Sequence, residues 1–337
     1  MDGNRHIEKR VLRLEGLTVG YHINKHTTRE VLSNLNVELR QGELICMLGA
    51  NGAGKSTLLR TISGVQHPLA GSVKINGRDV NEYGRRELSQ LISLVYTDNT
   101  LAGGLTVEEL VGLGRQPYTG FFGRLSEDDH RIVSEAIAAV GLTHKAADYV
   151  SCLSDGERQK AMIARALAQE TPIIILDEPT AFLDVASRIE TMKLLHNLAF
   201  NNGKAIILSS HDISQSLMLA SRLWLITGDG QLIDGVTEDL VLDGALNRLF
   251  PDRDVTFDPT IGDFFASTDS HRVVKLACDE PLLCHWLTNA LNRNNIITTD
   301  DADIAVEVLG RNKFVFDGKQ ITGISSLLSA LKQHFAD

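Results

Sequence analysis

The chain has only four cysteines, and they are scattered along the sequence: Cys46, Cys152, Cys278 and Cys284. No two of them form a close pair with the spacing of metal ligands, which argues against a zinc-type framework. So few cysteines suit a reducing cytosol, where structural disulfides are rare. We expect each cysteine to be a small core residue.

Long apolar runs and an excess of basic charge are also missing. No apolar run approaches the roughly 18 residues of a membrane span, and the polar, charged start Met1–Arg10 does not resemble a signal peptide. The net charge is −10, whereas a nucleic-acid footprint needs a basic face, so we expect no nucleic-acid partner. The 337 residues, 43% of them hydrophobic, allow two domains and a sizeable core.

A glycine-rich stretch stands out against this background. Gly49–Thr57 matches the phosphate-loop pattern G-x-x-x-x-G-K-[ST]. The apolar run Glu43–Leu48 precedes it as a strand, and Leu58–Ile62 continues as a helix. Glycines let the backbone fold around a phosphate, and N–H groups at a helix start attract the anion. The pattern therefore predicts a nucleotide site.

The last three residues of the loop have distinct expected roles. Lys55 would reach the β- and γ-phosphates of a bound nucleotide, Ser56 would hold Mg²⁺, and Thr57 would lie near the α-phosphate. Tyr21, shortly before the loop, could stack on an adenine ring or could simply pack at a strand end. ATP and Mg²⁺ are the expected cofactors.

Two buried-looking strands end in polar residues. Ile173–Leu176 is followed by Asp177 and Glu178, and the strand after it ends at His211. Alternating strands and helices predict right-handed crossovers and a mainly parallel sheet, whose strand ends are ligand-binding positions. The plainer alternatives are a solvated carboxylate for Asp177 and a packing or surface role for His211.

Five landmarks now stand in one order: Gly49–Thr57, Leu153–Glu157, Ile173–Glu178, Leu183–Asp184 and His211. Over residues 10 to 250 the chain resembles the nucleotide-binding subunit of an ATP-binding cassette (ABC) transporter. The resemblance implies an α/β P-loop ATPase with a mainly parallel core sheet, an antiparallel β subdomain and a helical subdomain. The loop Gly114–Arg124 resembles importers of iron chelates, haem and cobalamin.

The resemblance also implies roles for single residues. Glu178 would be the general base, His211 would contact the γ-phosphate, and Lys55 would complete the catalytic set. Asp184 belongs to one of the five landmarks, and its plainer alternative is a simple helix cap. Mg²⁺ would be held by Ser56, Asp177 and the residue at position 97, Thr97. The expected contacts to ATP are Tyr21, Gly49, Asn51, Gly52, Ala53, Gly54, Lys55, Ser56 and Thr57.

A second set of contacts implies an oligomer. Ser154, Gly156 and Glu157 would act on ATP held by the opposite subunit, so the active form would be a head-to-tail homodimer with two ATP molecules. It would drive two membrane permease subunits from the cytoplasmic face of the inner membrane. A periplasmic binding protein would deliver the substrate. The implied function is ATP hydrolysis that powers import of an iron chelate, haem or cobalamin.

The sequence departs from the family pattern in two places. The usual Leu-Ser-Gly-Gly-Gln has Asp155 and Glu157 in place of Gly and Gln, and two carboxylates near a triphosphate should cost free energy unless they point away. The strand Leu91–Tyr96 should be followed by a Gln, but Thr97 and Asp98 stand there. Thr97 is shorter, so its contact with the metal is in doubt, and Asp98 or a water could replace it.

The composition changes at Pro251, which predicts a domain edge. We expect an ABC nucleotide-binding domain over 1–266 and a small α+β module over 267–337. A βαββα order is expected, with strands at 272–277, 304–309 and 313–316 and helices at 281–291 and 324–335. Support of the fold or dimer is one role for this module, and ligand sensing is the other.

Rival functions are a soluble ABC protein of DNA repair or translation, a small-molecule kinase, and an ABC transporter for a different cargo. The repair type carries long inserted coiled coils and the translation type carries two cassettes, and neither feature is in this sequence. A kinase would need neither the Ser154 segment nor His211.

Overall fold

The computed structural model describes residues 9–24, 27–96, 104–120, 122–251, 254–266 and 270–336. The chain divides into two compact units, Met1–Arg253 with Phe257–Asp263, and Asp254–Thr256 with Phe264–Asp337. Each unit has a hydrophobic core of its own. Within the described ranges, no helix combines the length and the apolar character that crossing a membrane requires.

The central sheet of the first unit has the strand order β11-β10-β4-β9-β8-β7. Every neighbouring pair is parallel except β10 and β11. Strands β4, β8 and β9 are buried along their whole length, as continuous apolar runs predict. The mainly parallel core sheet is thereby confirmed. The strands are β4 (Leu44–Gly49), β7 (Ile92–Val95), β8 (Ile173–Leu176), β9 (Ala205–Ser209), β10 (Arg222–Ile226) and β11 (Leu232–Val236).

A second, antiparallel sheet carries the first strands of the chain. Its order is β2-β1-β5-β6, with β3 paired to β1. Residues 22–24 and 27–28 continue the first two strands, because their hydrogen-bonded ladder extends past the buried residues. The strands are β1 (Arg10–Asn24), β2 (Thr27–Leu35), β3 (Glu38–Arg40), β5 (Ala70–Ile75) and β6 (Arg78–Asp79).

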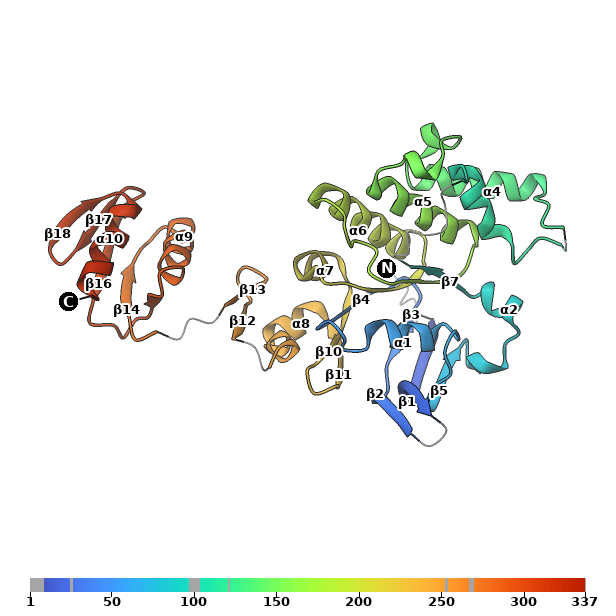
Figure 1. The fold of residues 1–337 in the computed structure, drawn as a ribbon, viewed down its shortest axis with the longest axis horizontal. Coiled ribbons are helices and arrows are strands. Elements are labelled where there is room, and N and C mark those ends of the chain that lie inside the picture. Colours follow the sequence, from blue (N-terminus) through green and yellow to red (C-terminus); the bar gives the residue numbers. More distant parts are fainter. Residues whose placement is uncertain are drawn as a thin grey trace, which may run out of the picture. The chain divides into compact units, whose positions relative to one another are not determined.

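Helices α3, α4 and α5 pack against one another and form the helical part of this unit, in which α4 and α5 run side by side (Figure 1). Ser126 and Asp129 form a capping box at the start of α4. Helix α5 begins at Asp155, because Ser154 caps it. The helices are α1 (Lys55–Ile62), α2 (Arg85–Ser89), α3 (Val107–Gly112), α4 (Glu127–Ala139), α5 (Asp155–Ala168), α6 (Val185–Phe200), α7 (Ile213–Leu219) and α8 (Thr237–Leu242).

The second unit is a mixed sheet with two helices, α9 and α10. The sheet order is β15-β14-β16-β17-β18, and its core includes Val274, Phe314 and Leu327. The expected βαββα order did not include two strands of this sheet, β15 and β18. A separate two-stranded sheet pairs β12 (Val255–Asp258) with β13 (Asp263–Ala266). The elements are β14 (Val273–Ala277), α9 (Pro281–Asn292), β15 (Ile297–Thr298), β16 (Ala305–Gly310), β17 (Lys313–Phe316), β18 (Lys319–Thr322) and α10 (Ile324–His334).

Candidate nucleotide site

The glycine-rich loop joins β4 to α1, as the sequence pattern predicts. Gly52 and Gly54 have φ angles of +80° and +103°, a region that residues with a side chain seldom adopt. A Cβ atom at Gly54 would also lie 2.4 Å from Val31 Cγ1. The tight curve of the loop therefore depends on glycine. It presents the start of α1, with its unpaired N–H groups, to the adjoining pocket.

Lys55 is the first residue of α1, and it is 5% exposed. Its ammonium group donates hydrogen bonds to the carbonyl oxygens of Gly49 at 2.7 Å and Ala50 at 3.2 Å. Burial lowers the pKa of Lys55, while the nearby Glu178 and Asp177 carboxylates act to raise it. The loop thus holds a cation at the phosphate end of the pocket.

The end of β8 brings oxygen atoms next to α1. Ser56 Oγ donates to Asp177 Oδ1 at 3.2 Å, and Ser209 Oγ donates to the same oxygen at 2.7 Å. Ser209 Oγ also accepts a hydrogen bond from the Glu178 backbone amide at 2.9 Å. Ser209 was missed at the sequence level. Strands β8 and β9 are parallel with Leu176 opposite Leu208, and this register, which the sequence does not contain, places Ser209 beside Asp177.

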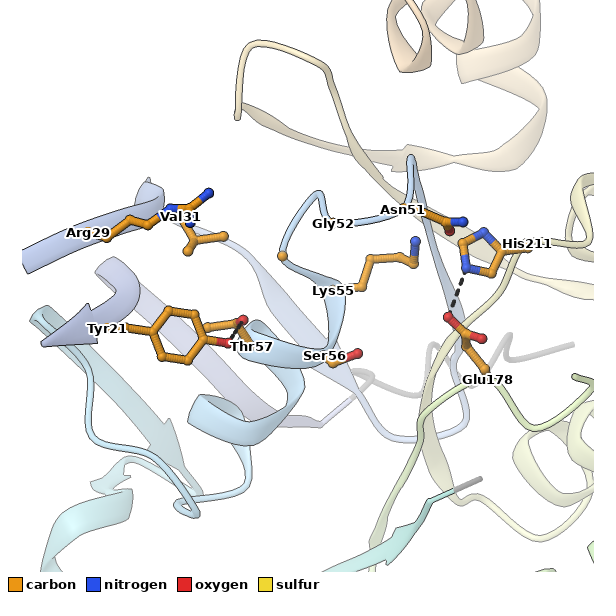
Figure 2. Close-up of a pocket in the computed structure, with 11 residues that line it drawn as sticks. Tyr21, Arg29, Val31, Asn51, Gly52, Lys55, Ser56, Thr57, Glu178 and His211 are labelled. Carbon is orange, nitrogen blue, oxygen red and sulfur yellow. Dashed lines mark hydrogen bonds and ion pairs between the residues drawn. The ribbon is translucent and has the colours of Figure 1, made fainter. Parts of the chain in front are cut away.

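Glu178 and His211 come from neighbouring strand ends and touch each other. His211 Nε2 lies 2.8 Å from Glu178 Oε1, and both side chains line the pocket (Figure 2). Glu178 has a φ of +52°, a strained conformation for a residue with a side chain. Strain of this kind is found where the surrounding structure holds a residue for function.

The other end of the pocket is built from the β1–β2 hairpin. Tyr21 and Thr57 share a hydrogen bond of 2.5 Å between their hydroxyl oxygens. Arg29 and Val31 also line this end, and neither was singled out from the sequence. Figure 2 shows these hairpin residues on one side of Lys55 and the Glu178–His211 pair on the other. The cavity has a volume of about 270 Å³.

The structure gathers most of the predicted site residues around this one cavity. Asp177 does not line it but is bonded to Ser56, which does. Gly49 and Ala53 belong to the loop, where the Ala53 amide donates to the Ala50 carbonyl at 3.1 Å. The lining residues are Tyr21, Arg29, Val31, Asn51, Gly52, Gly54, Lys55, Ser56, Thr57, Glu178 and His211.

The segment from Ser154 to Glu157 does not line this pocket. It forms the start of α5, where Glu157 Oε2 accepts hydrogen bonds from the Ser154 amide at 3.0 Å and hydroxyl at 2.9 Å. Lys145 Nζ lies 2.7 Å from Glu157 Oε1, and Asp155 pairs with Arg158 at 3.0 Å. Both unusual carboxylates therefore have cationic partners within the chain.

Gly156 lies in the first turn of α5. A Cβ atom there would lie 2.7 Å from Ser187 Oγ near the start of α6, so a larger residue would displace that contact. Thr97 and Asp98, the two candidates for the metal slot after β7, lie outside the described residues.

The donor atoms present suit Mg²⁺. Ser56 Oγ and Asp177 Oδ1 are hard oxygen donors next to the phosphate loop, and Mg²⁺ in nucleotide sites takes one or two such groups together with phosphate oxygens and water. Across the described residues, no cluster of three or more His, Cys, Asp or Glu side chains could hold a metal alone. The site thus fits a metal that arrives with its nucleotide.

Comparisons with known proteins agree with this geometry. The protein-family model described as "ABC transporter" matches residues 32–181. An uncharacterized ABC transporter ATP-binding protein of Methanocaldococcus jannaschii is 38% identical over 254 residues, which cover 75% of this chain and 86% of that one. The ferric enterobactin transport ATP-binding protein FepC of Escherichia coli is 37% identical over 250 residues, covering 74% and 90%.

Among solved structures, the ATP-binding cassette MJ0796, a dimer in a post-hydrolysis state bound to ADP and Pi, superposes with a TM-score of 0.58 at 29% identity. The match covers 67% of this chain and 98% of that one. The Bacillus subtilis iron(3+)-hydroxamate import ATP-binding protein FhuC is 32% identical over 254 residues, covering 74% of this chain and 91% of that protein.

Proposed function

The chain belongs to the ABC transporter family of ATP-binding proteins, and from this membership we propose that it is the ATPase subunit of an importer for an iron chelate, haem or cobalamin. Its fold is that of a P-loop ABC ATPase. The observation that carries the proposal is the Glu178–His211 contact at the edge of the phosphate-loop pocket. The names of relatives, ferric enterobactin transport and iron(3+)-hydroxamate import, support the choice of cargo.

The residues have complementary tasks in hydrolysis. The loop amides and Lys55 bind the β- and γ-phosphates. Ser56 and Asp177 hold Mg²⁺, which when bound neutralises charge on the phosphate oxygens. Glu178 orients a water for attack and takes its proton. Its 2.8 Å contact with His211 aligns the carboxylate, and His211 is the proposed contact to the γ-phosphate.

We also propose a head-to-tail homodimer. The pocket has no lining residue from the Ser154 segment in the described part of the chain, so this helix start is free to act on ATP bound by a second copy. Ser154 and the amides near Gly156 would then cap that γ-phosphate, as helix N-termini do for anions. The dimeric MJ0796 cassette supports this arrangement.

Two membrane permease subunits are the proposed partners, which places the protein on the cytoplasmic face of the cell membrane. A periplasmic binding protein takes part indirectly by delivering cargo. The test is to purify the tagged full-length chain from detergent-solubilised membranes of its native cells. We expect a polytopic membrane protein to co-purify in equal molar amount, and ATP turnover of the complex to rise when that protein is reconstituted in lipid with its cargo-binding protein.

The matched control is the Lys55→Ala chain, which should retain the membrane partner but lose turnover, because the cation for the phosphates is gone. A wild-type chain that stays free of any membrane protein, with turnover insensitive to lipid reconstitution, would contradict the importer proposal. Stimulation by nucleic acid or ribosomes would favour the soluble ABC alternative.

A further inference from the structure

Arg29 is a cation in the nucleotide pocket that the proposed chemistry does not use. It lies in β2 with an exposed side chain and lines the pocket together with Tyr21 and Val31 (Figure 2). Its side chain forms neither a hydrogen bond nor an ion pair with any of the described residues. A guanidinium that pairs with none of the described residues, in a chain of net charge −10, is available to a ligand.

The register of the hairpin explains why Arg29 points into the pocket. Arg29 is the direct cross-strand partner of Tyr21, and side chains of directly opposed residues lie on the same face of a sheet. Val31, two residues further along β2, also lines the pocket. The face packs against the phosphate loop, since Val31 Cγ1 fills the space where a Cβ of Gly54 would stand.

The two ends of the pocket have different chemistry. At the phosphate end, Lys55 and the loop amides bind anions, and Glu178 and His211 close the site. At the hairpin end stand an aromatic ring, an aliphatic side chain and a planar guanidinium. Such a set suits a flat, apolar ring with polar edges, because guanidinium planes stack on aromatic faces in a way that a lysine ammonium does not.

We propose that Arg29 is a positioning residue for the nucleoside end of the bound nucleotide, where its guanidinium packs on the purine base beside Tyr21. This inference rests on the proposed function, since it assumes that the pocket binds ATP. Arg29 then sets affinity for the base, whereas Lys55 and the loop set affinity for the polyphosphate.

Calorimetric titration of the full-length chain tests this with two probes, ATP and inorganic tripolyphosphate. Arg29→Ala should weaken ATP binding about 5- to 10-fold, the size of a partly desolvated cation–π contact, and leave tripolyphosphate binding unchanged. Arg29→Lys should recover little of the loss, because it restores the charge without the plane. The control is Arg13→Ala, which removes an exposed arginine from the same sheet outside the pocket and should change neither affinity.

Several outcomes overturn the inference. If Arg29→Ala loses affinity equally for ATP and for tripolyphosphate, and Arg29→Lys recovers both affinities, Arg29 acts only through its charge. Unchanged ATP affinity in Arg29→Ala, with wild-type binding intact, overturns this inference alone. A wild-type chain that does not bind ATP overturns the proposed function and this inference together.

Discussion

At the scale of single residues, Glu178 is the most important residue for the proposed hydrolysis. Its backbone has φ +52°, its amide is held by Ser209 and its carboxylate meets His211. Two contacts and a strained backbone hold this one carboxylate at the pocket of the phosphate loop. A group held this way suits proton transfer, which needs the base within hydrogen-bond reach of the attacking water.

Glu178→Gln should therefore keep ATP binding and lower turnover by about 10²-fold or more, because an amide cannot take the proton of water. The amide has the same shape and can still accept a hydrogen bond from His211, so an ATP-bound dimer should accumulate. Light scattering with ATP measures the dimer, and phosphate release measures turnover.

Glu238→Gln, at an exposed glutamate in α8 away from the pocket, is the matched control and should behave as wild type. Turnover of Glu178→Gln at the wild-type rate would refute the assignment of Glu178 as general base.

At the scale of elements, the start of α5 depends on Glu157. The hydrogen bond from Lys145, followed by the bonds from the amide and hydroxyl of Ser154, lowers the pKa of Glu157 from 4.5 to about 2. A carboxyl whose pKa is lower in the folded state stabilises the fold above its unfolded pKa. This contribution is present at pH 7 and declines as the pH falls from about 4.5 toward about 2.

Glu157→Gln should lower the free energy of unfolding by about 1 kcal/mol at pH 7, because glutamine keeps the capping box but loses the charge. The figure stays small because the carboxylate side chain is 28% exposed and solvent screens the pair. Urea unfolding at pH 7 and at successively lower pH measures it, and the difference from wild type should shrink below about pH 4.5.

Glu190→Gln provides the control, since Glu190 is a 59% exposed partner of Lys160 and its loss should cost under about 0.5 kcal/mol. If the difference in unfolding free energy between Glu157→Gln and wild type grows as the pH falls, the lowered pKa of Glu157 does not contribute to stability.

At the scale of the whole molecule, the two units have separate cores. All the residues of the candidate site lie in the first unit. The second unit, of about 75 residues, is small for independent stability. We propose that it regulates the ATPase or supports the dimer, and the predicted boundary at residues 266 and 267 remains part of that proposal.

A chain that ends at Phe265 should bind ATP with an affinity close to that of the full-length protein, because Lys55, Asp177, Glu178 and His211 are all retained. Dimer stability or the response of turnover to a cytoplasmic signal should decline. Calorimetry, thermal melting and turnover of the two chains compare them. A shortened chain that is folded but unable to bind ATP would mean that the second unit completes the site.

The amino-acid sequence determined the features that contiguous residues build. The phosphate loop, the buried strands β8 and β9 and the Ser126–Asp129 capping box follow from glycines, apolar runs and helix-start residues within a few positions. Strand β18 could have been added, because Asp317-Gly318 is a two-residue hairpin turn with φ of +52° and +68°. The roles assigned to the site residues remain predictions from resemblance.

The tertiary structure alone decided which distant residues meet. Ser209 reaches Asp177 through the register of parallel strands, Arg29 enters the pocket through the register of a hairpin, and Lys145 neutralises Glu157. A one-residue slip in register would turn each strand residue to the opposite face. That register is set by packing and pairing across the whole sheet, so no local pattern could reveal these contacts.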